Sequence, residues 1–534
     1  MASRSQQIRA RFSVNQLGWG SLACLSCATL MAFWGLVSFQ SEGFDWRLLT
    51  DSYFHHIVVF SLTQACLSAV ISVALAWPVA RSLYYLPGLP GKQHLLNLCL
   101  LCFVMPTLVV VTGLVVLFGS TGVLSPWVDR LVGETWNLYG LSGILLAHVY
   151  LNMPFAVRVL YLKLEVIPDS SWKLSRQLKL GRFTRFRAIE WPSLRSTLFI
   201  VTGFIFVLCF NSFAIVLALG GGPKSATLEV AIYQALKYDF NIPEALVYAW
   251  VQFVIAGLAF LLVSKWGVPS WLGGDKHESL WRPLPGTLVK RGMQCLCYFT
   301  ALLLLLPIGA IVATAWQASL LSLDLLLLAK SFLLTVGLAV FSAALALLLA
   351  YFSLYPARAS GLLGQEKRRV ILEWWAGHAL IAPAMVISVG LYIYLLRRID
   401  IEQWWLVCVL LINAFLLVPF ALQKLKPVLY VYDKAYGRLA ASLKMTTRQR
   451  CMVEWHYAKP AVMASFSLTL MLAVGEVAVF SIFGDYQWPT LPWLIYSYAG
   501  TYRLAEASLV SLLLFVLCLG VLTLFNRWQP ARGE

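Results

Sequence analysis

Charged side chains are scarce in this chain. Asp, Glu, Lys and Arg make up 12% of its 534 residues, whereas hydrophobic residues make up 60%. So little charge excludes an ordinary soluble globular protein and indicates a polytopic membrane protein. Apolar runs of about 20 residues, the length that crosses a bilayer as a helix, recur along the whole sequence. The shorter, alternating strands of a β-barrel do not fit this pattern, so the predicted fold is an all-α polytopic membrane protein in a lipid bilayer.

The motifs of common catalytic sites are also missing. There is no HExxH, no pair of catalytic carboxylates and no nucleophile motif, and histidines such as His148 and His378 are scattered. The stretch "GGGPKS" (220–225) lacks the G-x-x-x-x-G-K spacing of a phosphate-binding loop and follows a predicted span on the far side of the membrane. A membrane enzyme is therefore disfavoured, and no metal or bound cofactor is expected. Energy for any transport must come from a separate ATPase or from an ion gradient.

Twelve apolar runs are predicted to cross the membrane. They are residues 18–39, 57–80, 95–119, 139–162, 196–219, 244–264, 293–316, 327–354, 373–396, 403–423, 460–483 and 504–526.

Acidic residues are the scarcer charged kind, with 24 Asp and Glu against 41 Lys and Arg, which gives a formal net charge of +17. The basic residues lie in loops between predicted spans, so they indicate orientation in a membrane rather than binding to nucleic acid. The loops on one side of the membrane are the more basic ones, and the positive-inside rule makes that side cytoplasmic. Both termini are then expected in the cytoplasm.

Segments of the second half repeat the first half in the same order. The matching pairs are "MPTLVVVTGL" (105–114) with "APAMVISVGL" (382–391), "MPFAVRVL" (153–160) with "VPFALQKL" (418–425), "LKLGRFTRFRAIEW" (178–191) with "LKMTTRQRCMVEW" (443–455), and "TLEVAIYQAL" (227–236) with "TLPWLIYSYA" (490–499). We therefore expect two six-helix domains, 1–264 and 293–534, joined by a cytoplasmic linker, 265–292. Six is an even number, so the repeats should be parallel and related by an axis along the membrane normal.

The most basic stretch, "RQLKLGRFTRFRAIEWP" (176–192), belongs to one of the repeated segments. Both copies lie in cytoplasmic connections of about 30 residues, which is long for a joint between helices. Each contains a segment with helical spacing and ends in an aliphatic residue, Glu and Trp. A loop that only lies on anionic lipid would not require the same sequence twice.

These loops resemble the "EAA" loop of binding-protein-dependent ABC importer permeases. The resemblance implies a short coupling helix that docks in a groove on a cytoplasmic ATPase, so two loops imply two ATPase copies, together with a periplasmic substrate-binding protein. ATP is then used by the partner ATPase and not by this chain. The residues that the resemblance assigns to ATPase coupling are Trp172, Leu174, Leu178, Gly181, Glu190, Tyr436, Leu439, Leu443 and Glu454.

A narrower resemblance covers most of the chain. The stretches "LALGGGPKSATLEVAIYQAL" (217–236) and "TLPWLIYSYAGTYR" (490–503) are similar to the fused two-domain permease of bacterial thiamine and thiamine-phosphate importers. This implies import of thiamine or its phosphate esters across the bacterial inner membrane. Two alternatives stay open, a ferric iron permease of the same fused type and an ion-coupled secondary transporter. The loop "RSLYYLPGLPGKQH" (81–94), which lacks an acidic residue, disfavours the secondary transporter.

Glu476 stands out within the predicted spans. A carboxylate at membrane depth costs about 2.5–3.5 kcal/mol on insertion scales, so it should face a cavity or a partner. The repeat offset aligns it with Ser212, beside Asn211, and we expect a polar group from each half along a central pathway. Aromatic residues of the far-side segment 486–503, such as Trp488, would offer ring faces to a cationic substrate. A purely structural role for Glu476, bonded to another helix, is an equally good interpretation.

Overall fold

The computed structural model describes residues 2–38, 46–133, 135–264, 285–318, 324–380, 383–443 and 445–527. Within these ranges every regular element is helical. The elements of the first half are α1 (Ala2–Ser38), η2 (Trp46–Thr50), α2 (Ser52–Tyr85), α3 (Lys92–Val104), α4 (Thr107–Phe118), α5 (Ser125–Val132), α6 (Leu141–Glu165), α7 (Asp169–Gln177), α8 (Arg182–Arg185), η3 (Phe186–Glu190), α9 (Trp191–Phe210), α10 (Ala214–Leu219), η4 (Pro223–Ser225), α11 (Leu228–Lys237) and α12 (Ile242–Ser264).

The second half follows the same plan. Its elements are α13 (Thr287–Ala315), α14 (Leu325–Leu362), α15 (Glu366–Gly377), η6 (His378–Leu380), α16 (Ala384–Leu396), α17 (Ile401–Ser442), α18 (Thr447–Val474), α19 (Ala478–Phe483), α20 (Leu491–Gly500) and α21 (Leu504–Arg527). Most of the expected linker, residues 265–284, lies outside the described residues, and its last residues form the start of α13. The predicted all-α membrane fold is confirmed.

The described residues contain ten helices that are long and apolar enough to cross a membrane, or eleven if α3 and α4 count as one bent span. Several of the twelve predicted spans are broken rather than continuous helices. The helices α3 and α4 meet at an angle of 104°. Their break falls at Met105 and Pro106, where the proline disfavours helical backbone at the residue before it. The matching span of the second half is likewise divided, into α15, η6 and α16.

Two further predicted spans are interrupted at equivalent places. The run 196–219 divides into α9 and α10 around Asn211, and the run 460–483 divides into α18 and α19 around Gly475. Both predicted spans are continuous in hydrophobicity, which is why the pattern alone did not show the breaks. Each break places polar backbone groups inside the helix bundle, together with a polar side chain, Asn211 in the first half and Glu476 in the second.

The two halves have the same internal packing. In the first half α2 packs against α6 and α9, and in the second half α14 packs against α17 and α18. A pair of side-chain hydroxyls repeats as well: Ser61 Oγ accepts from the Leu228 backbone N–H at 3.0 Å, and Thr335 Oγ1 accepts from the Leu491 N–H at 2.8 Å. Each hydroxyl satisfies one free N–H at the start of α11 or α20, whose first-turn N–H groups have no partner within the helix.

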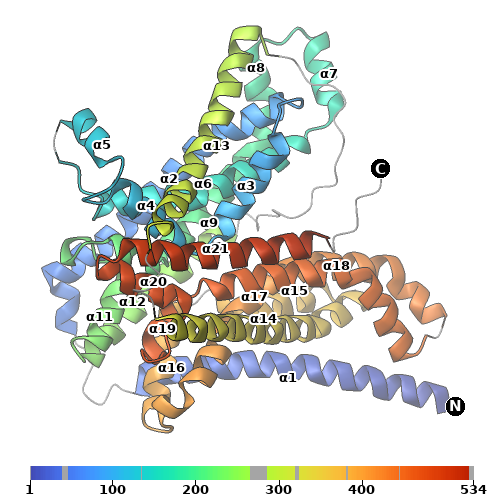
Figure 1. The fold of residues 1–534 in the computed structure, drawn as a ribbon. Helices are drawn as coiled ribbons and strands as arrows, with labels where there is room; N and C mark the ends of the chain where they lie inside the picture. Colours follow the sequence, from blue (N-terminus) through green and yellow to red (C-terminus); the bar gives the residue numbers. More distant parts are fainter. Residues whose placement is uncertain are drawn as a thin grey trace.

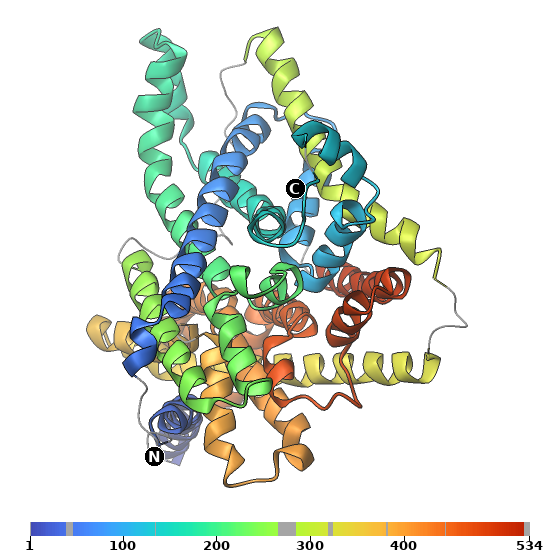
Figure 2. The ribbon, with the colours of Figure 1, turned by 90° about the vertical axis from the view of Figure 1, so that its left-hand side faces the viewer.

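The halves exchange their first helices. Helix α1 packs against α14 and α16 of the second half, and α13 packs against α2 and α4 of the first half (Figures 1 and 2). The repeated glycines Gly113 and Gly390 lie at these contacts. A Cβ at Gly390 would stand 2.3 Å from the Ala32 carbonyl oxygen, and one at Gly113 would stand 2.8 Å from Pro307 Cβ. Glycine therefore lets each exchanged helix approach the other half closely, as small residues do between membrane helices.

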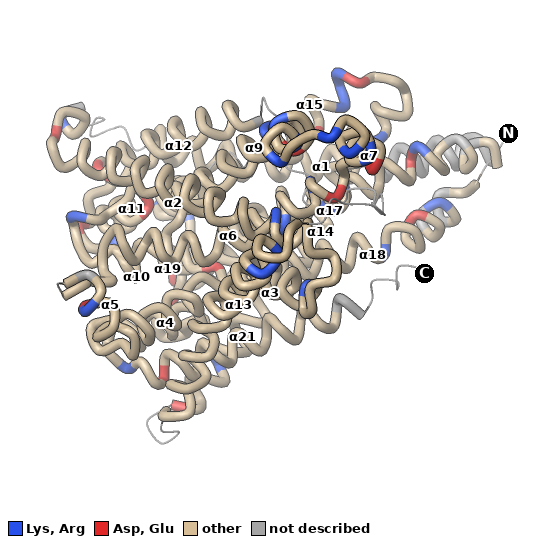
Figure 3. Tube along the Cα trace, turned by 90° about the horizontal axis from the view of Figure 1, so that it is seen from above, with Lys and Arg blue, Asp and Glu red and all other residues tan. Residues whose placement is uncertain are grey.

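The bundle has two chemically different ends. Seen from above, α7 and α15 lie at the end where α1 begins and α21 ends, and α5, α10 and α11 lie at the opposite end (Figure 3). The repeated basic loops belong to the first of these ends. We refer to it as the loop end and to the opposite one as the far end.

Candidate functional site

The first basic loop folds as the short helices α7 and α8, which run through η3 into α9. Trp172 anchors α7, because its buried ring lies 6.1 Å from the rings of both Tyr84 and Tyr85 on α2. Leu174 and Leu178 point outward, and Leu178 is 61% exposed. The loop therefore combines a buried aromatic anchor with an outward apolar surface, as a helix that docks in a groove requires.

Gly181 lies between α7 and α8 and is exposed. Its φ is −65°, which any residue adopts, so the backbone conformation there does not depend on glycine.

The second basic loop has a different backbone. Here α17 continues without interruption to Ser442, so Tyr436 and Leu439 lie on the last turns of a long helix rather than on a separate short one. Both side chains are exposed, and Leu443, just after the helix, is 64% exposed. Helix α18 then begins with a capping box in which Thr446 and Gln449 each bond the backbone N–H of the other. The two loops thus present similar leucines from different local structures.

Glu190 lies inside the protein, unlike the exposed leucines of the same loop. It is fully buried, and its carboxylate accepts hydrogen bonds from Arg81 Nε at 2.9 Å and Arg81 Nη2 at 3.1 Å. Tyr85 Oη also donates to it, at 2.7 Å. A two-pronged guanidinium–carboxylate pair fixes orientation as well as distance. Glu190 therefore ties the start of α9 to the loop end of α2.

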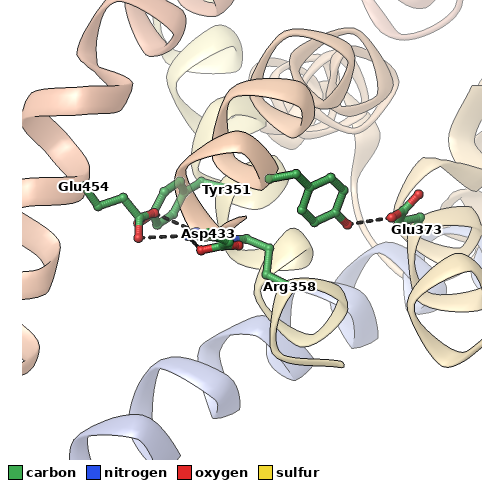
Figure 4. Close-up of polar contacts among 6 residues, drawn as sticks. Tyr351, Arg358, Glu373, Asp433 and Glu454 are labelled. Carbon is green, nitrogen blue, oxygen red and sulfur yellow. Dashed lines mark hydrogen bonds and ion pairs between the residues drawn. The ribbon is translucent and has the colours of Figure 1, made fainter. Parts of the chain in front are cut away.

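Glu454 repeats this arrangement with an additional carboxylate. Arg358 on α14 donates to Glu454 from Nη1 at 2.6 Å and from Nη2 at 2.9 Å, and to Asp433 from Nε at 2.7 Å and Nη2 at 2.8 Å (Figure 4). Tyr351 Oη donates to Glu454 at 2.8 Å. One buried arginine thus joins α14, α17 and α18 next to the second basic loop.

Arg81 and Arg358 belong to the candidate site, and sequence reasoning missed both. Arg81 ends the stretch "WPVAR" (77–81) and Arg358 ends "YPAR" (355–358), so both follow a proline near the end of a long apolar helix. This resemblance between the halves was a usable signal. In the sequence each arginine counts only as a cytoplasmic loop charge, because its carboxylate partner lies about 100 residues away.

The expected pathway residues are only partly brought together. Glu476 precedes α19, and its Oε1 accepts from the Val479 backbone N–H at 2.9 Å, while its buried Oε2 has no partner among the described residues. Asn211 lies at the α9–α10 break and accepts from Gln252 Nε2 at 3.4 Å. Ser212 follows it in the same break. Trp488 belongs to another environment, with Lys330 Nζ 5.0 Å from its ring centroid.

Glu229 is a second buried carboxylate that the sequence analysis missed. It lies in the first turn of α11, is 1% exposed and accepts from Gln252 Nε2 at 2.5 Å. Helix α11 packs against α19, which begins two residues after Glu476. One carboxylate from each half therefore lies near the contact between α11 and α19, and we call Glu229 and Glu476 the central carboxylates. Glu229 belongs to the repeated segment "TLEVAIYQAL". That segment served only to identify the duplication, so the charge of Glu229 was not considered.

Comparisons with known proteins agree with this architecture. The family described as "Binding-protein-dependent transport system inner membrane component" matches residues 49–268. The thiamine transport system permease protein of Haemophilus influenzae is 34% identical over 493 residues, which cover 90% of each chain. The proteins of the same name from Salmonella typhimurium and Escherichia coli are 34% and 33% identical over 98% or more of each chain. The chain therefore belongs to the family of thiamine transport system permease proteins, multi-pass inner membrane components of binding-protein-dependent transport systems.

Proposed function

We propose that this chain is the permease of an ABC importer that moves thiamine or its phosphate esters from a periplasmic binding protein into the cytoplasm. The observation that carries the proposal is the duplicated loop, in which an arginine-held glutamate fixes the start of α9 or α18 beside exposed leucines. A rigidly held apolar surface at the loop end is what an ATPase needs in order to pull on the membrane helices. The names of the relatives support the substrate.

Two loops on one chain would engage two copies of the ATPase, and ATP would be used there. Leu174 and Leu178 supply the contact in the first loop, and Leu439 and Leu443 supply it in the second. In this assignment Trp172 and the two glutamates act as positioning residues, because they are buried. The loop end, with both chain termini, then faces the cytoplasm of a bacterial cell, as the positive-inside rule requires.

The two central carboxylates suit a cationic substrate. Thiamine carries a permanently cationic thiazolium, which needs a compensating negative group in a low-dielectric pathway. Glu229 and Glu476 offer one carboxylate from each half, and the unpartnered Glu476 Oε2 is the available acceptor. The interaction should be weak, because a tight one would trap the substrate inside.

Reconstitution tests the proposal directly. The chain alone in proteoliposomes should neither hydrolyse ATP nor accumulate thiamine, whereas the chain with its ATPase and binding protein should do both. Accumulation of thiamine by the chain alone in response to a proton gradient would identify a secondary transporter instead. ATP-dependent uptake of ferric iron without uptake of thiamine would identify the chain as a ferric iron permease of the same fused type.

Glu476→Gln should slow thiamine uptake about fivefold in the full complex, the factor that corresponds to about 1 kcal/mol. Glutamine keeps the shape of the side chain and can still accept from the Val479 N–H, so folding and assembly should be spared. Initial uptake rates at saturating binding protein measure the effect. Glu402→Gln, on an exposed position of α17, removes the same charge outside the pathway and should transport normally. Equal rates for both variants would leave Glu476 with a structural role.

A further inference from the structure

A cavity of about 420 Å³ lies at the far end and is lined by residues of both halves. The first half contributes α10, η4, α11 and the residues that follow α11, and the second half contributes Tyr496 from α20. Its volume falls in the range of about 300–1,000 Å³ that small-molecule sites occupy. It is distinct from the central carboxylates, which do not line it.

One wall of the cavity is the glycine run of "GGGPKS" (220–225), which the sequence analysis excluded as a phosphate loop. Gly221 and Gly222 have φ values of 70° and 126°, which side chains rarely adopt. A Cβ at Gly221 would also stand 2.9 Å from Tyr139 Cβ. The glycines are therefore needed to let the bare backbone form this wall.

The other walls are aromatic. Tyr233 in the middle of α11 and Tyr238 just after its end pack edge to face with ring centroids 5.7 Å apart, and Tyr496 lines the cavity from the other half. Tyr496 is itself supported by Trp493, whose ring centroid lies 5.3 Å away. Tyr238 is 67% exposed, so its ring is accessible from outside. Aromatic faces of this kind attract cations and stack with flat rings.

The charge at the cavity is negative. Asp239 lines it, is exposed and makes no ion pair with any residue that the structure describes. The neighbouring Lys237 does not line the cavity; its ammonium lies 5.4 Å from the ring centroid of Tyr392. A carboxylate beside several tyrosines favours a cation over an anion.

We propose that this cavity is an entry site for a flat aromatic cation, in which Tyr238 and Tyr496 contact the ring and Asp239 balances the charge. The inference rests on the proposed function and deepens it, since the thiazolium ring of thiamine is such a cation. Helix α11 then reaches from the cavity to a central carboxylate, because Tyr233, which lines the cavity, lies about one helical turn from Glu229.

Ligand-observed saturation-transfer NMR on the full chain in lipid nanodiscs tests the entry site without its partners. Thiamine is the probe, and thiochrome, its uncharged flat oxidation product, is the matched neutral ligand. The wild-type chain should give a saturable signal with thiamine and a much weaker one with thiochrome. Tyr238→Ala should weaken the apparent affinity for thiamine about two- to fivefold, the loss expected for one cation–π contact. Asp239→Asn should weaken it by a similar factor of about five.

Two variants serve as controls. Tyr238→Phe keeps the ring and should bind thiamine as the wild type does, and Trp127→Ala removes an exposed aromatic ring from α5 at the same end but outside the cavity. If the full complex imports thiamine while Tyr238→Ala and Asp239→Asn bind it as the wild type does, the entry site is wrong and the proposed function stands. If thiamine binds with the expected pattern but the complex does not import it, the entry site stands and the proposed function fails.

Discussion

Arg358→Ala is expected to destabilise the folded chain by about 3–5 kcal/mol, the cost of removing one partner from a buried ion pair. Arg358 is 5% exposed and is the hydrogen-bond donor that Glu454 and Asp433 share. Without it two nearly buried carboxylates repel each other across α17 and α18. The loss should appear as a lower temperature of unfolding in detergent. It should also appear as a lower yield of monodisperse protein in size-exclusion chromatography.

The first half provides a graded comparison. Arg81→Ala leaves one carboxylate, Glu190, which keeps its hydrogen bond from Tyr85, so we expect a smaller loss than for Arg358→Ala. Arg503→Ala removes a more exposed partner of Glu506 and should cost about 0–1 kcal/mol. Arg358→Lys keeps the charge but loses the planar fork and should recover stability only in part. Equal stability of Arg358→Ala and Arg503→Ala would show that the network does not hold the second loop.

The double variant Leu178→Asp with Leu443→Asp should lose nearly all binding to the ATPase. Each leucine is more than half exposed in the isolated chain, so a charge there costs the fold little. Buried at an interface, each apolar anchor contributes about 1–3 kcal/mol, equivalent to about 5- to 150-fold in affinity. Co-purification of the ATPase with the tagged permease and ATP-driven uptake both measure the loss.

The matched control for this pair is Leu363→Asp. Leu363 follows α14, is also strongly exposed and lies outside both basic loops. The Leu363→Asp variant should bind the ATPase normally. Single variants at Leu178 or Leu443 should give intermediate binding, because one loop would still dock. Normal binding of the ATPase by the double variant would show that the ATPase contacts other residues.

The sequence determined the membrane class, the position of most spans and the duplication. Each of these depends on local composition, such as an apolar run long enough to cross a bilayer, or on short stretches that occur twice. The helical spacing before Leu178 and Leu443 likewise indicated the helices that both exposed residues directly follow. These properties can be recognised without knowledge of the fold, because each depends on short stretches of sequence and not on contacts between distant residues.

The tertiary structure decided which groups meet. Glu190 and Glu454 belong to the predicted coupling segments, yet arginines about 100 residues earlier turn both of them inward. The breaks at Pro106 and Gly475 lie within continuous apolar runs. The contact between α11, which carries Glu229, and α19, which follows Glu476, depends on how the halves associate.

The exchange of α1 and α13 between the halves was likewise invisible in the sequence. A lipid-compatible helix carries no mark of the half against which it packs, since its neighbours and the lipid are equally apolar. Close approach at Gly113 and Gly390 makes that choice, and shape complementarity of this kind exists only once the helices are in contact.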